Sequence, residues 1–409
     1  MVNIHKNILL LTSSYPFGIG EAFIETEISS LSEKNNLFIM PTYPRGKQKT
    51  QYINNKNITY INEKLLSITS IFIALFFIIK HPKHFYKLFK LCKDKSIKKT
   101  IRNLVLIPKA LKTTNIINKN KINIDFCYTH WLSAPMQLAL LINYLTDIPF
   151  GTTGHRFDLV DNNNFEQKFQ KASFIRLISQ YSKELLPSKI YNKFSDKIHI
   201  IYMGINIPQN NNNKIKTDTI KGVSIGNIIE VKGHIYLINA IKILKDYGII
   251  VYLDIYGDGY LKKQLQEECS RLGISEQVNF MGNVIHNKLM EQLSSNNYNF
   301  CCLPSIDLGN HHHEGIPVAI LESMAHKIPC ISTNTGSIPE LIEHNKTGLL
   351  VNDKDSKLIA HAIKDITEDT IMRDTIIDNA YNLVSTQFNA KTNNDILYNL
   401  IIYNSTQNN

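Results

Sequence analysis

Short apolar runs alternate with longer stretches of helical periodicity along most of the chain. The runs are rich in Ile, Leu, Val and Phe, and few of them alternate with polar residues. Such continuous apolar runs indicate parallel strands that helices cover on both faces, which is an α/β arrangement. They predict strands at residues 7–13, 36–41, 122–129, 174–179, 197–203, 222–227, 249–257, 277–282, 299–305 and 328–333.

A polar, Asn-rich stretch at residues 208–218 interrupts this pattern and predicts a linker between two α/β lobes. The first lobe is predicted to span residues 1–207 and the second residues 219–385. A C-terminal helix is expected over 386–409, where it can pack back on the first lobe. Ligands of open α/β sheets bind beyond the carboxyl ends of the strands, so we expect the functional motifs at strand ends, facing a cleft between the lobes.

Composition narrows the possible settings for the protein. The chain has 409 residues, of which 43% are hydrophobic and 20% charged, as in ordinary globular proteins. Six cysteines without a Cys-x-x-Cys pair suggest neither a zinc cluster nor a disulfide framework, which favours a reducing cytoplasm. The N-terminal MVNIHKNILLL has too short an apolar core for a signal peptide and is better explained as a buried strand.

The net charge of +10 comes from one segment. Residues 79–121 hold thirteen Lys or Arg and one acid, Asp94. The apolar run before them, residues 65–79, is too short for a convincing membrane span. Lysines 83, 87, 90 and 93 then alternate with apolar residues at helical spacing. Residues 65–102 therefore predict an apolar helix beside a basic amphipathic one, which suits an anionic membrane surface. The alternative is a solvated face of ordinary lobe helices, and nucleic acid is not expected.

The stretch HHHEGIPVAILESMA at residues 311–325 holds the most specific chemistry. Pro317 suits a helix start, and a helix is predicted from Val318 to about Lys327. The backbone N–H groups at such a start attract anions, above all phosphate. Glu314 precedes this start and Glu322 lies on its second turn, so both are better aimed at hydroxyl groups. A diphosphate between hydroxyl-rich rings is a nucleotide sugar. The alternative is an acid favoured by the helix dipole alone.

Two other patterns exclude rather than suggest chemistry. Neighbouring histidines at 311–313 cannot easily converge on one ion, so no metal is expected and the run is interpreted as a solvated loop. Gly18 and Gly20 resemble a dinucleotide fingerprint, but Phe23 stands in place of the third glycine and no acid ends the next strand. A nicotinamide cofactor is therefore not expected. Instead, we expect the segment with Gly18 and Gly20 to be a mobile loop over the cleft.

Further candidates follow other predicted strands. Lys232 lies in a turn where its ammonium group could meet a diphosphate. Gly257 and Gly259 would permit close approach of the backbone to a ligand. His155 could hydrogen-bond a substrate hydroxyl or carry a proton, and His130 is a weaker candidate of the same kind on the acceptor side. Each candidate has a simpler explanation. Lys232 could be an ordinary surface lysine, the two glycines could belong to a plain turn, and the histidines could be loop residues with their hydrogen bonds made within the protein.

Together these stretches resemble family 4 glycosyltransferases of the GT-B fold. The second lobe carries the more specific motifs, with Glu314-x7-Glu322 in the expected context. The first lobe resembles the family at YPFGIGEAFIETEISSL and TTGHRFDL. The second lobe does so at SIGNIIEVKGHIYLINAI, LDIYGDGYLKKQL, VNFMGNV, FCCLPS and EGIPVAILESMAHKIPCISTNTGSIPELIEHNKTGLLV. The resemblance implies two Rossmann-like parallel-sheet lobes that face a central cleft.

The resemblance also assigns roles by position. Glu314 would hold hydroxyls of the donor sugar, Glu322 the ribose and Lys232 the diphosphate. His155 would contact the donor sugar from the other lobe. The backbone of Gly315, Ile316 and Pro317 would lie near the sugar and the phosphates. Asn227 stands where the family usually has Arg, so one phosphate-binding charge is missing from the donor site.

The resemblance implies a retaining transferase that needs no bound metal and no cofactor, in which the departing diphosphate assists deprotonation of the acceptor. The expected donor is a UDP- or GDP-sugar. The expected acceptor is a glycan or lipid-linked glycan of capsule, O-antigen, lipopolysaccharide or exopolysaccharide synthesis, at the cytoplasmic face of the inner membrane. Two alternatives stay open: a nucleotide-sugar epimerase of the same fold, and a non-catalytic membrane- or nucleic-acid-binding protein.

Overall fold

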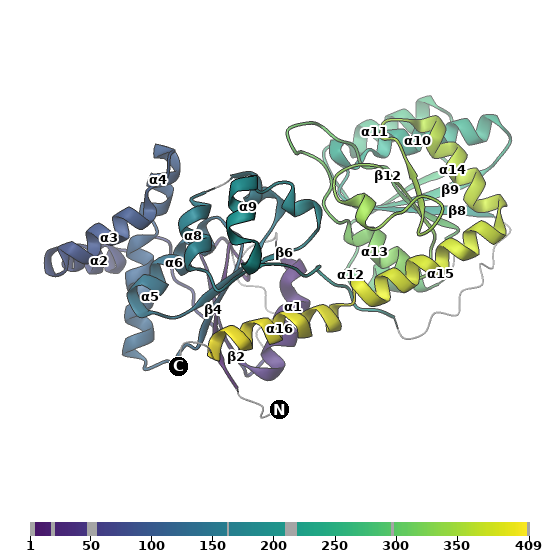
Figure 1. The fold of residues 1–409 in the computed structure, drawn as a ribbon. Helices are drawn as coiled ribbons and strands as arrows, with labels where there is room; N and C mark the ends of the chain where they lie inside the picture. Colours follow the sequence, from purple (N-terminus) through teal and green to yellow (C-terminus); the bar gives the residue numbers. More distant parts are fainter. Residues whose placement is uncertain are drawn as a thin grey trace. The chain divides into compact units, whose positions relative to one another are not determined.

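The computed structural model describes residues 5–17, 21–46, 55–161, 163–208, 219–295 and 298–406. The chain divides into two compact units (Figure 1). Unit 1 holds Met1–Met203 together with Ala390–Asn409, and unit 2 holds Gly204–Asn389. The predicted linker lies outside the described residues except for Pro208, and so do Gly18 and Gly20.

Unit 1 is built on a seven-stranded parallel sheet in the order β3-β2-β1-β4-β5-β6-β7. Its strands are β1 (Asn7–Thr12), β2 (Asn36–Pro41), β3 (Ile58–Tyr60), β4 (Phe126–His130), β5 (Phe150–Gly154), β6 (Phe174–Leu177) and β7 (Ile198–Ile200). Its α-helices are α1 (Glu25–Lys34), α2 (Ile68–Lys80), α3 (Pro82–Cys92), α4 (Ile97–Leu104), α5 (Ile107–Lys119), α6 (Ala134–Thr146), α7 (Arg156–Asp161), α8 (Phe165–Lys171), α9 (Ser188–Phe194) and α16 (Ala390–Thr406). The 3-10 turns are η1 (Ala22–Ile24), η3 (Tyr181–Lys183) and η4 (Ser195–Lys197).

The strands of unit 1 are apolar throughout because both faces of the sheet are covered. Along β1, Leu9 and Leu11 belong to a core shared with α5, α6 and α8. Ile8 and Leu10 point the other way, into a second core completed by α1 and α16. The C-terminal helix thus packs on the first unit, where Leu397 and Ile401 are fully buried.

Unit 2 is built on a six-stranded parallel sheet in the order β10-β9-β8-β11-β12-β13. Its strands are β8 (Ile220–Ile225), β9 (Val251–Tyr256), β10 (Val278–Gly282), β11 (Phe300–Leu303), β12 (Cys330–Thr333) and β13 (Leu349–Val351). Its helices are α10 (His234–Asp246), α11 (Lys262–Arg271), α12 (His286–Ser294), α13 (Val318–Ala325), α14 (Ser356–Glu368), α15 (Thr370–Gln387) and the 3-10 turns η5 (Glu230–Lys232) and η6 (Ile338–Glu340).

The predicted fold class, two Rossmann-like parallel sheets, is confirmed. The predicted ranges leave out β3, β5 and β13. The strands β3 and β13 have only three residues each, and β5, with the sequence FGTTG, has no apolar run. The pattern also began β4 too early, because Ile122 and Ile124 are apolar but precede the ladder, which starts at Phe126.

Residues 65–102 form α2, α3 and α4 rather than part of the sheet. Within the described residues no single helix is both long and apolar enough to cross a membrane. Only α2 and α3 taken together reach that length and composition, and they meet at a bend of 118°.

Candidate active site

The strand order of unit 2 reverses between β8 and β11, which are neighbours in the sheet. The loops that leave the carboxyl ends of these two strands diverge there, and this is where open α/β sheets bind their ligands. The loop after β8 carries Lys232, and the loop after β11 carries Glu314. The topology therefore brings together two residues that lie 82 positions apart in sequence.

Lys232 and Glu314 form an ion pair at this position. The Lys232 Nζ donates to Glu314 Oε2 at 2.6 Å, and Ser305 Oγ donates to the same oxygen at 3.3 Å. Their side chains are only 17% and 15% exposed, so solvent screens the pair less than a surface pair. The sequence predicted separate roles for the two residues and gave no sign of their contact.

Gly233 explains how Lys232 reaches the end of β11. Its φ of +64° lies in the left-handed region, and a Cβ there would stand 2.0 Å from the carbonyl oxygen of Pro304. Only glycine lets the turn η5 pass so close to the residue that follows β11. The turn in turn fixes the backbone of Lys232, whose N–H donates to Ile229 O at 3.1 Å.

The start of α13 lies directly after Glu314. The helix begins at Val318 as predicted and ends at Ala325, two residues early, and Pro317 is its N-cap residue, without a side-chain cap. The space beside the Cα of Gly315 is open. A Cβ there would have no atom within 4 Å other than those of its two neighbours in the chain. Loop residues 336–337 hold the segment from behind: Ser337 N donates to Glu314 O at 3.4 Å. The uncapped N–H groups and the open space fit an anionic ligand.

Glu322 is 8% exposed on the second turn of α13. Its Oε1 lies 2.6 Å from Nε2 of His286, the first residue of α12, whose side chain is 63% exposed. The sequence analysis missed His286. The signal that could have found it is its position, four residues after the end of β10, at the same edge of the sheet.

Two predicted glycines allow close packing of the loops after β8 and β9. A Cβ at Gly257 would lie 2.0 Å from Gly226 O, and one at Gly259 would lie 2.2 Å from Ile228 O. Their approach to a donor stays a prediction. The side chain of Asn227, in the same loop, is exposed.

The histidine run divides between surface and core. His311 and His312 are exposed, whereas His313 is buried with Nδ1 2.9 Å from Glu314 O. Among the residues that the structure describes, no group of three or more His, Cys, Asp or Glu side chains is arranged to hold a metal ion. His313 therefore supports the backbone of Glu314.

Unit 1 has its own strand-order reversal, between β1 and β4, and the predicted histidines lie beside it. His130 ends β4 and His155 follows β5, and their Nδ1 and Nε2 atoms are 3.2 Å apart. The other nitrogen of His130 lies 2.7 Å from Glu27 Oε1, and Arg176 Nη1 donates to Glu27 Oε2 at 2.5 Å. All four side chains are buried.

The charges of this buried network are set by its members. Burial raises the pKa of Glu27, but His130 and Arg176 outweigh that effect and hold it well below its ordinary value. Burial, together with His130 and Arg176, lowers the pKa of His155 well below its ordinary value. A neutral His155 at neutral pH favours hydrogen bonding to a hydroxyl over proton transfer.

Sequence reasoning also missed Glu21, which organises the loop after β1. Its carboxylate accepts hydrogen bonds from the backbone of Ser13, Ser14 and Tyr15 and from Trp131 Nε1. Phe23 packs edge-on against His155, with ring centroids 5.2 Å apart. Three of these partners lie six to eight residues before Glu21, whereas Trp131 lies 110 residues away in sequence.

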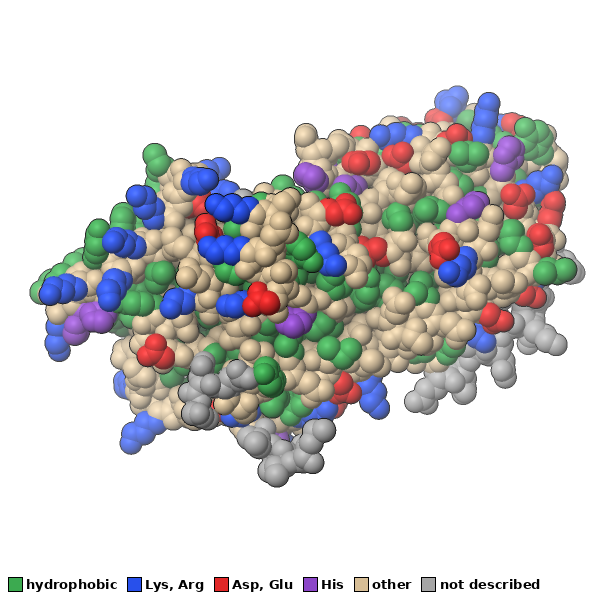
Figure 2. Space-filling model, in the orientation of Figure 1, with side chains coloured by type: hydrophobic (Ala, Val, Ile, Leu, Met, Phe, Trp, Pro, Cys, Tyr) green, Lys and Arg blue, Asp and Glu red, His purple; other side chains and the backbone are tan. Residues whose placement is uncertain are grey.

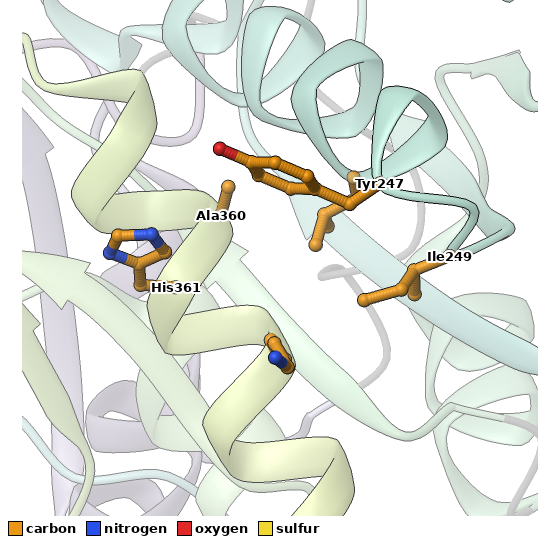
Figure 3. A pocket seen from close by; sticks show the side chains of 6 residues that line it. Tyr247, Ile249, Ala360 and His361 are labelled. Carbon is orange, nitrogen blue, oxygen red and sulfur yellow. The ribbon is translucent and has the colours of Figure 1, made fainter.

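A cavity of about 370 Å³ elsewhere in unit 2 does not belong to the candidate site (Figure 3). Tyr247 and Ile249 line it from the segment that enters β9, and Ala360 and His361 line it from α14. It therefore lies at the amino edge of the sheet, opposite the ends that carry Lys232 and Glu314.

The comparisons with known proteins agree with this geometry. Residues 207–383 match the family described as glycosyl transferases group 1. The amylovoran biosynthesis glycosyltransferase AmsK of Erwinia amylovora is 29% identical over 58% of this chain and 60% of its own length. The putative colanic acid biosynthesis glycosyltransferase WcaL of Salmonella typhimurium is 28% identical over 50% of this chain and 51% of its own length. The chain thus aligns with only about half to three fifths of these relatives.

Similarity in three dimensions extends over both units. The crystal structure of Anabaena HepE in complex with UDP superposes with a TM-score of 0.69 at 17% identity and covers 97% of this chain and 100% of that one. The crystal structure of a glycosyltransferase from Rickettsia africae superposes with a TM-score of 0.71 at 16% identity. It covers 98% of this chain and 99% of that one. These likenesses show the fold. The chain therefore has the GT-B fold, and its residues 207–383 are similar to the family described as glycosyl transferases group 1.

Proposed function

We propose that this protein is a retaining glycosyltransferase of family 4, which moves a sugar from a UDP- or GDP-sugar to a glycan or lipid-linked acceptor. The observation that carries the proposal is the Lys232–Glu314 ion pair at the strand-order reversal of unit 2, beside the uncapped start of α13. It combines a cation and helix N–H groups for a diphosphate with a carboxylate for hydroxyls.

The names of the relatives support a pathway as well as a reaction. AmsK and WcaL are named for the synthesis of amylovoran and colanic acid, and the HepE structure contains UDP. These names support the proposal that the reaction belongs to the synthesis of a cell-surface polysaccharide, such as a capsule, O-antigen or exopolysaccharide. We further propose that it takes place at the cytoplasmic face of the inner membrane.

Donor binding would exchange the partners of both glutamates. A diphosphate at the start of α13 carries more negative charge than Glu314 and would draw Lys232 away from it. Glu314 would then accept hydrogen bonds from hydroxyls of the sugar. In the same way, the ribose hydroxyls would replace His286 at Glu322. Without a ligand, Lys232 and His286 are the partners of the two carboxylates, which avoids leaving a largely buried carboxylate unpaired.

Catalysis would follow from holding the donor in place. Glu314 orients the sugar, and Lys232 together with the N–H groups of α13 stabilises the negative charge that grows on the departing diphosphate. That diphosphate is the expected acceptor of the proton that the attacking hydroxyl loses. His155 of unit 1, neutral and buried, is expected to bind a sugar hydroxyl.

A thermal-shift screen against UDP-, GDP- and ADP-sugars tests the proposal. A donor at one hundred times its dissociation constant should stabilise the protein by about 2.7 kcal/mol. Lys232→Met should abolish the shift, whereas Lys263→Met, whose side chain is 89% exposed on α11, should not. A protein that no nucleotide sugar stabilises would overturn the proposal.

The same donor then separates transferase from epimerase. Incubation with a membrane extract that contains acceptors should yield a labelled glycan and free nucleotide. Conversion of the donor into an isomeric nucleotide sugar, without any acceptor, would instead identify an epimerase.

A further inference from the structure

The helix α2 exposes its most apolar face. Its outward side chains follow the helical spacing i, i+4, i+8 and i+11, and Ile68, Phe72, Phe76 and Ile79 are 75%, 66%, 64% and 81% exposed. Ile71 and Leu75 widen this stripe at 45% and 51% exposure. The opposite face carries the small residues Ser70 and Ala74, which are buried. A helix of a soluble surface normally has the reverse arrangement.

The stripe continues into the next two helices. Tyr86 and Phe89 of α3 are 58% and 39% exposed, and Ile97 and Ile101 of α4 are 79% and 57% exposed. Figure 2 shows hydrophobic side chains among lysines and arginines over α2, α3 and α4. We call the exposed faces of α2–α4 the apolar-basic surface. Large contiguous apolar patches of this kind mark interaction sites.

The positive charge of this surface is largely uncompensated. The only acid within residues 80–102 is Asp94, and it accepts backbone hydrogen bonds from Ser96 and Asn164. No ion pair of the described residues involves the seven lysines at the surface. They are Lys80, Lys83, Lys87, Lys90, Lys93, Lys95 and Lys98.

Other cations of the segment are occupied and do not contribute. Lys99 and Arg102 pair with Asp161, and Lys112 pairs with Glu63. Lys109 is buried, donates to three backbone carbonyls, and has its pKa lowered by burial to about 7. The structure thus separates the lysines that serve the fold from the lysines that form the surface.

We propose that the apolar-basic surface docks on an anionic lipid bilayer, with the α2 stripe in the acyl boundary and the lysines at the headgroups. Charge complementarity favours this partner. A second copy of the chain would place the same seven lysines against each other, which is repulsive. The proposal does not depend on the transferase activity.

The geometry favours lying on the bilayer over crossing it. The 13 residues of α2 span about 20 Å, which is shorter than the roughly 30 Å hydrocarbon core. The inner face of α2 is also attached to unit 1, since Ile73 and Phe77 pack against its core and the helix contacts α5. Only the outer face is available to lipid.

Co-sedimentation of the full-length protein with vesicles of phosphatidylglycerol and phosphatidylcholine tests the proposal. A variant in which Ile68, Phe72, Phe76 and Ile79 are all changed to Ser should have a partition coefficient lower by about 100-fold or more. Burial of one such side chain contributes roughly tenfold. The matched control replaces Tyr247, Ile250, Ile371 and Ile396 with Ser, which are also exposed but lie elsewhere. It should bind as the wild type does.

The lysines should determine the lipid preference. Replacing Lys83, Lys87, Lys90 and Lys93 with Gln should weaken binding by about tenfold or more at low salt and make it less sensitive to salt. Vesicles of phosphatidylcholine alone should bind the wild-type protein much less than the anionic vesicles do.

A fluorescent probe keeps the test valid if the Ser variant misfolds. All six native cysteines are buried, so a dye will label Phe72→Cys selectively. An environment-sensitive dye at Phe72 should shift to the blue on addition of anionic vesicles, and the same dye at Ile371→Cys should not. Three results would overturn the proposal: no binding of the wild type to anionic vesicles, no dye shift at Phe72, or self-association without lipid that the Ser variant abolishes.

Discussion

At the scale of single residues, the site holds its acids in pairs that a ligand has to break. Glu314 has Lys232 as its partner, and Glu322 has His286. The two glutamates would meet different parts of a donor, one that reacts and one that does not. Mutations of the two should therefore change different kinetic constants.

Glu314→Gln should mainly lower the turnover number, by about 100-fold, because a misplaced sugar reacts slowly even when bound. Steady-state kinetics with the donor found in the screen measures this effect. Glu291→Gln, an exposed acid on α12, is the matched control and should leave both constants unchanged. Unchanged turnover in Glu314→Gln would remove this residue from the reaction.

Glu322→Gln should mainly raise the Michaelis constant of the donor, by about tenfold, because the ribose does not change during transfer. His286→Ala should not raise it, since His286 only occupies Glu322 until the ribose arrives. The two variants thus distinguish a residue that binds the nucleotide, Glu322, from one that only pairs with it in the free protein, His286. If His286→Ala weakens donor binding as much as Glu322→Gln does, His286 itself contacts the nucleotide.

At the scale of elements, both candidate sites depend on contacts between segments that follow different strands. In unit 2 the turn η5 passes the end of β11 at Gly233. In unit 1, the Glu27 network joins α1, β4, β6 and the residue after β5. Changes at these points should affect stability as well as chemistry.

Gly233→Ala should destabilise unit 2 by about 2 kcal/mol or more, because the added Cβ meets a backbone carbonyl in addition to the strain of the positive φ. Gly273→Ala is the matched control, since Gly273 has a similar φ of +66° but no atom within 4 Å of the new Cβ. Urea unfolding of both variants gives the difference. If both variants lose the same free energy of unfolding, the contact of the new Cβ with Pro304 O does not destabilise unit 2.

Glu27→Gln should cost about 3–5 kcal/mol at pH 7, because it leaves Arg176 buried without its carboxylate. The pKa of Glu27 is lower in the folded protein than its ordinary 4.5, so the stabilisation is full above that pH and is lost as the pH falls. The difference between wild type and variant should therefore shrink below pH 4.5, by up to about 1.4 kcal/mol per pH unit. Urea unfolding at pH 7 and pH 4 measures it, with the exposed Glu33→Gln as control. A difference that does not change with pH would contradict the pairing.

At the scale of the whole molecule, each unit has its own parallel sheet, its own core and its own strand-order reversal. The last helix, α16, nevertheless belongs to unit 1, although the chain has just left unit 2. Lys34 of α1 pairs with Asp395 of α16, and Leu397 lies in the same core as β1. The core of unit 1 therefore includes α16.

The protein should keep its proposed transferase activity in excess EDTA. Lys232 and the start of α13 supply the positive potential that a divalent ion would otherwise provide to a diphosphate. Donor turnover before and after chelation, with Mg²⁺ and Mn²⁺ added back, is the measurement. Activity that falls in EDTA and returns with a divalent ion would reopen His311 and His312 as ligands.

Local patterns were enough for much of this molecule. The parallel-sheet class followed from continuous apolar strands, because a strand buried on both faces has no polar side. The start of α13 followed from Pro317 and the apolar residues after it. Glu314, Glu322 and Lys232 were predicted as site residues from their sequence context, since motifs at strand ends are short and contiguous.

Contacts between distant segments could not be predicted from local sequence patterns. Glu27, Arg176 and His286 have ordinary neighbours in sequence, and only the tertiary fold brings their partners to them, as it brings Trp131 to Glu21. The packing role of Gly257 and Gly259 was also hidden, because it depends on the backbone of another loop.

The sequence by itself determined which residues carry charge, which runs are apolar, and which strand ends hold polar motifs, because these properties are local. The tertiary structure decided which of these residues meet. It joined Lys232 to Glu314, and it turned the apolar face of α2 outward among lysines that form no ion pair with any acid that the structure describes. The physical reason is that pairing and exposure depend on distances between segments, and only the packed sheets and helices fix those distances.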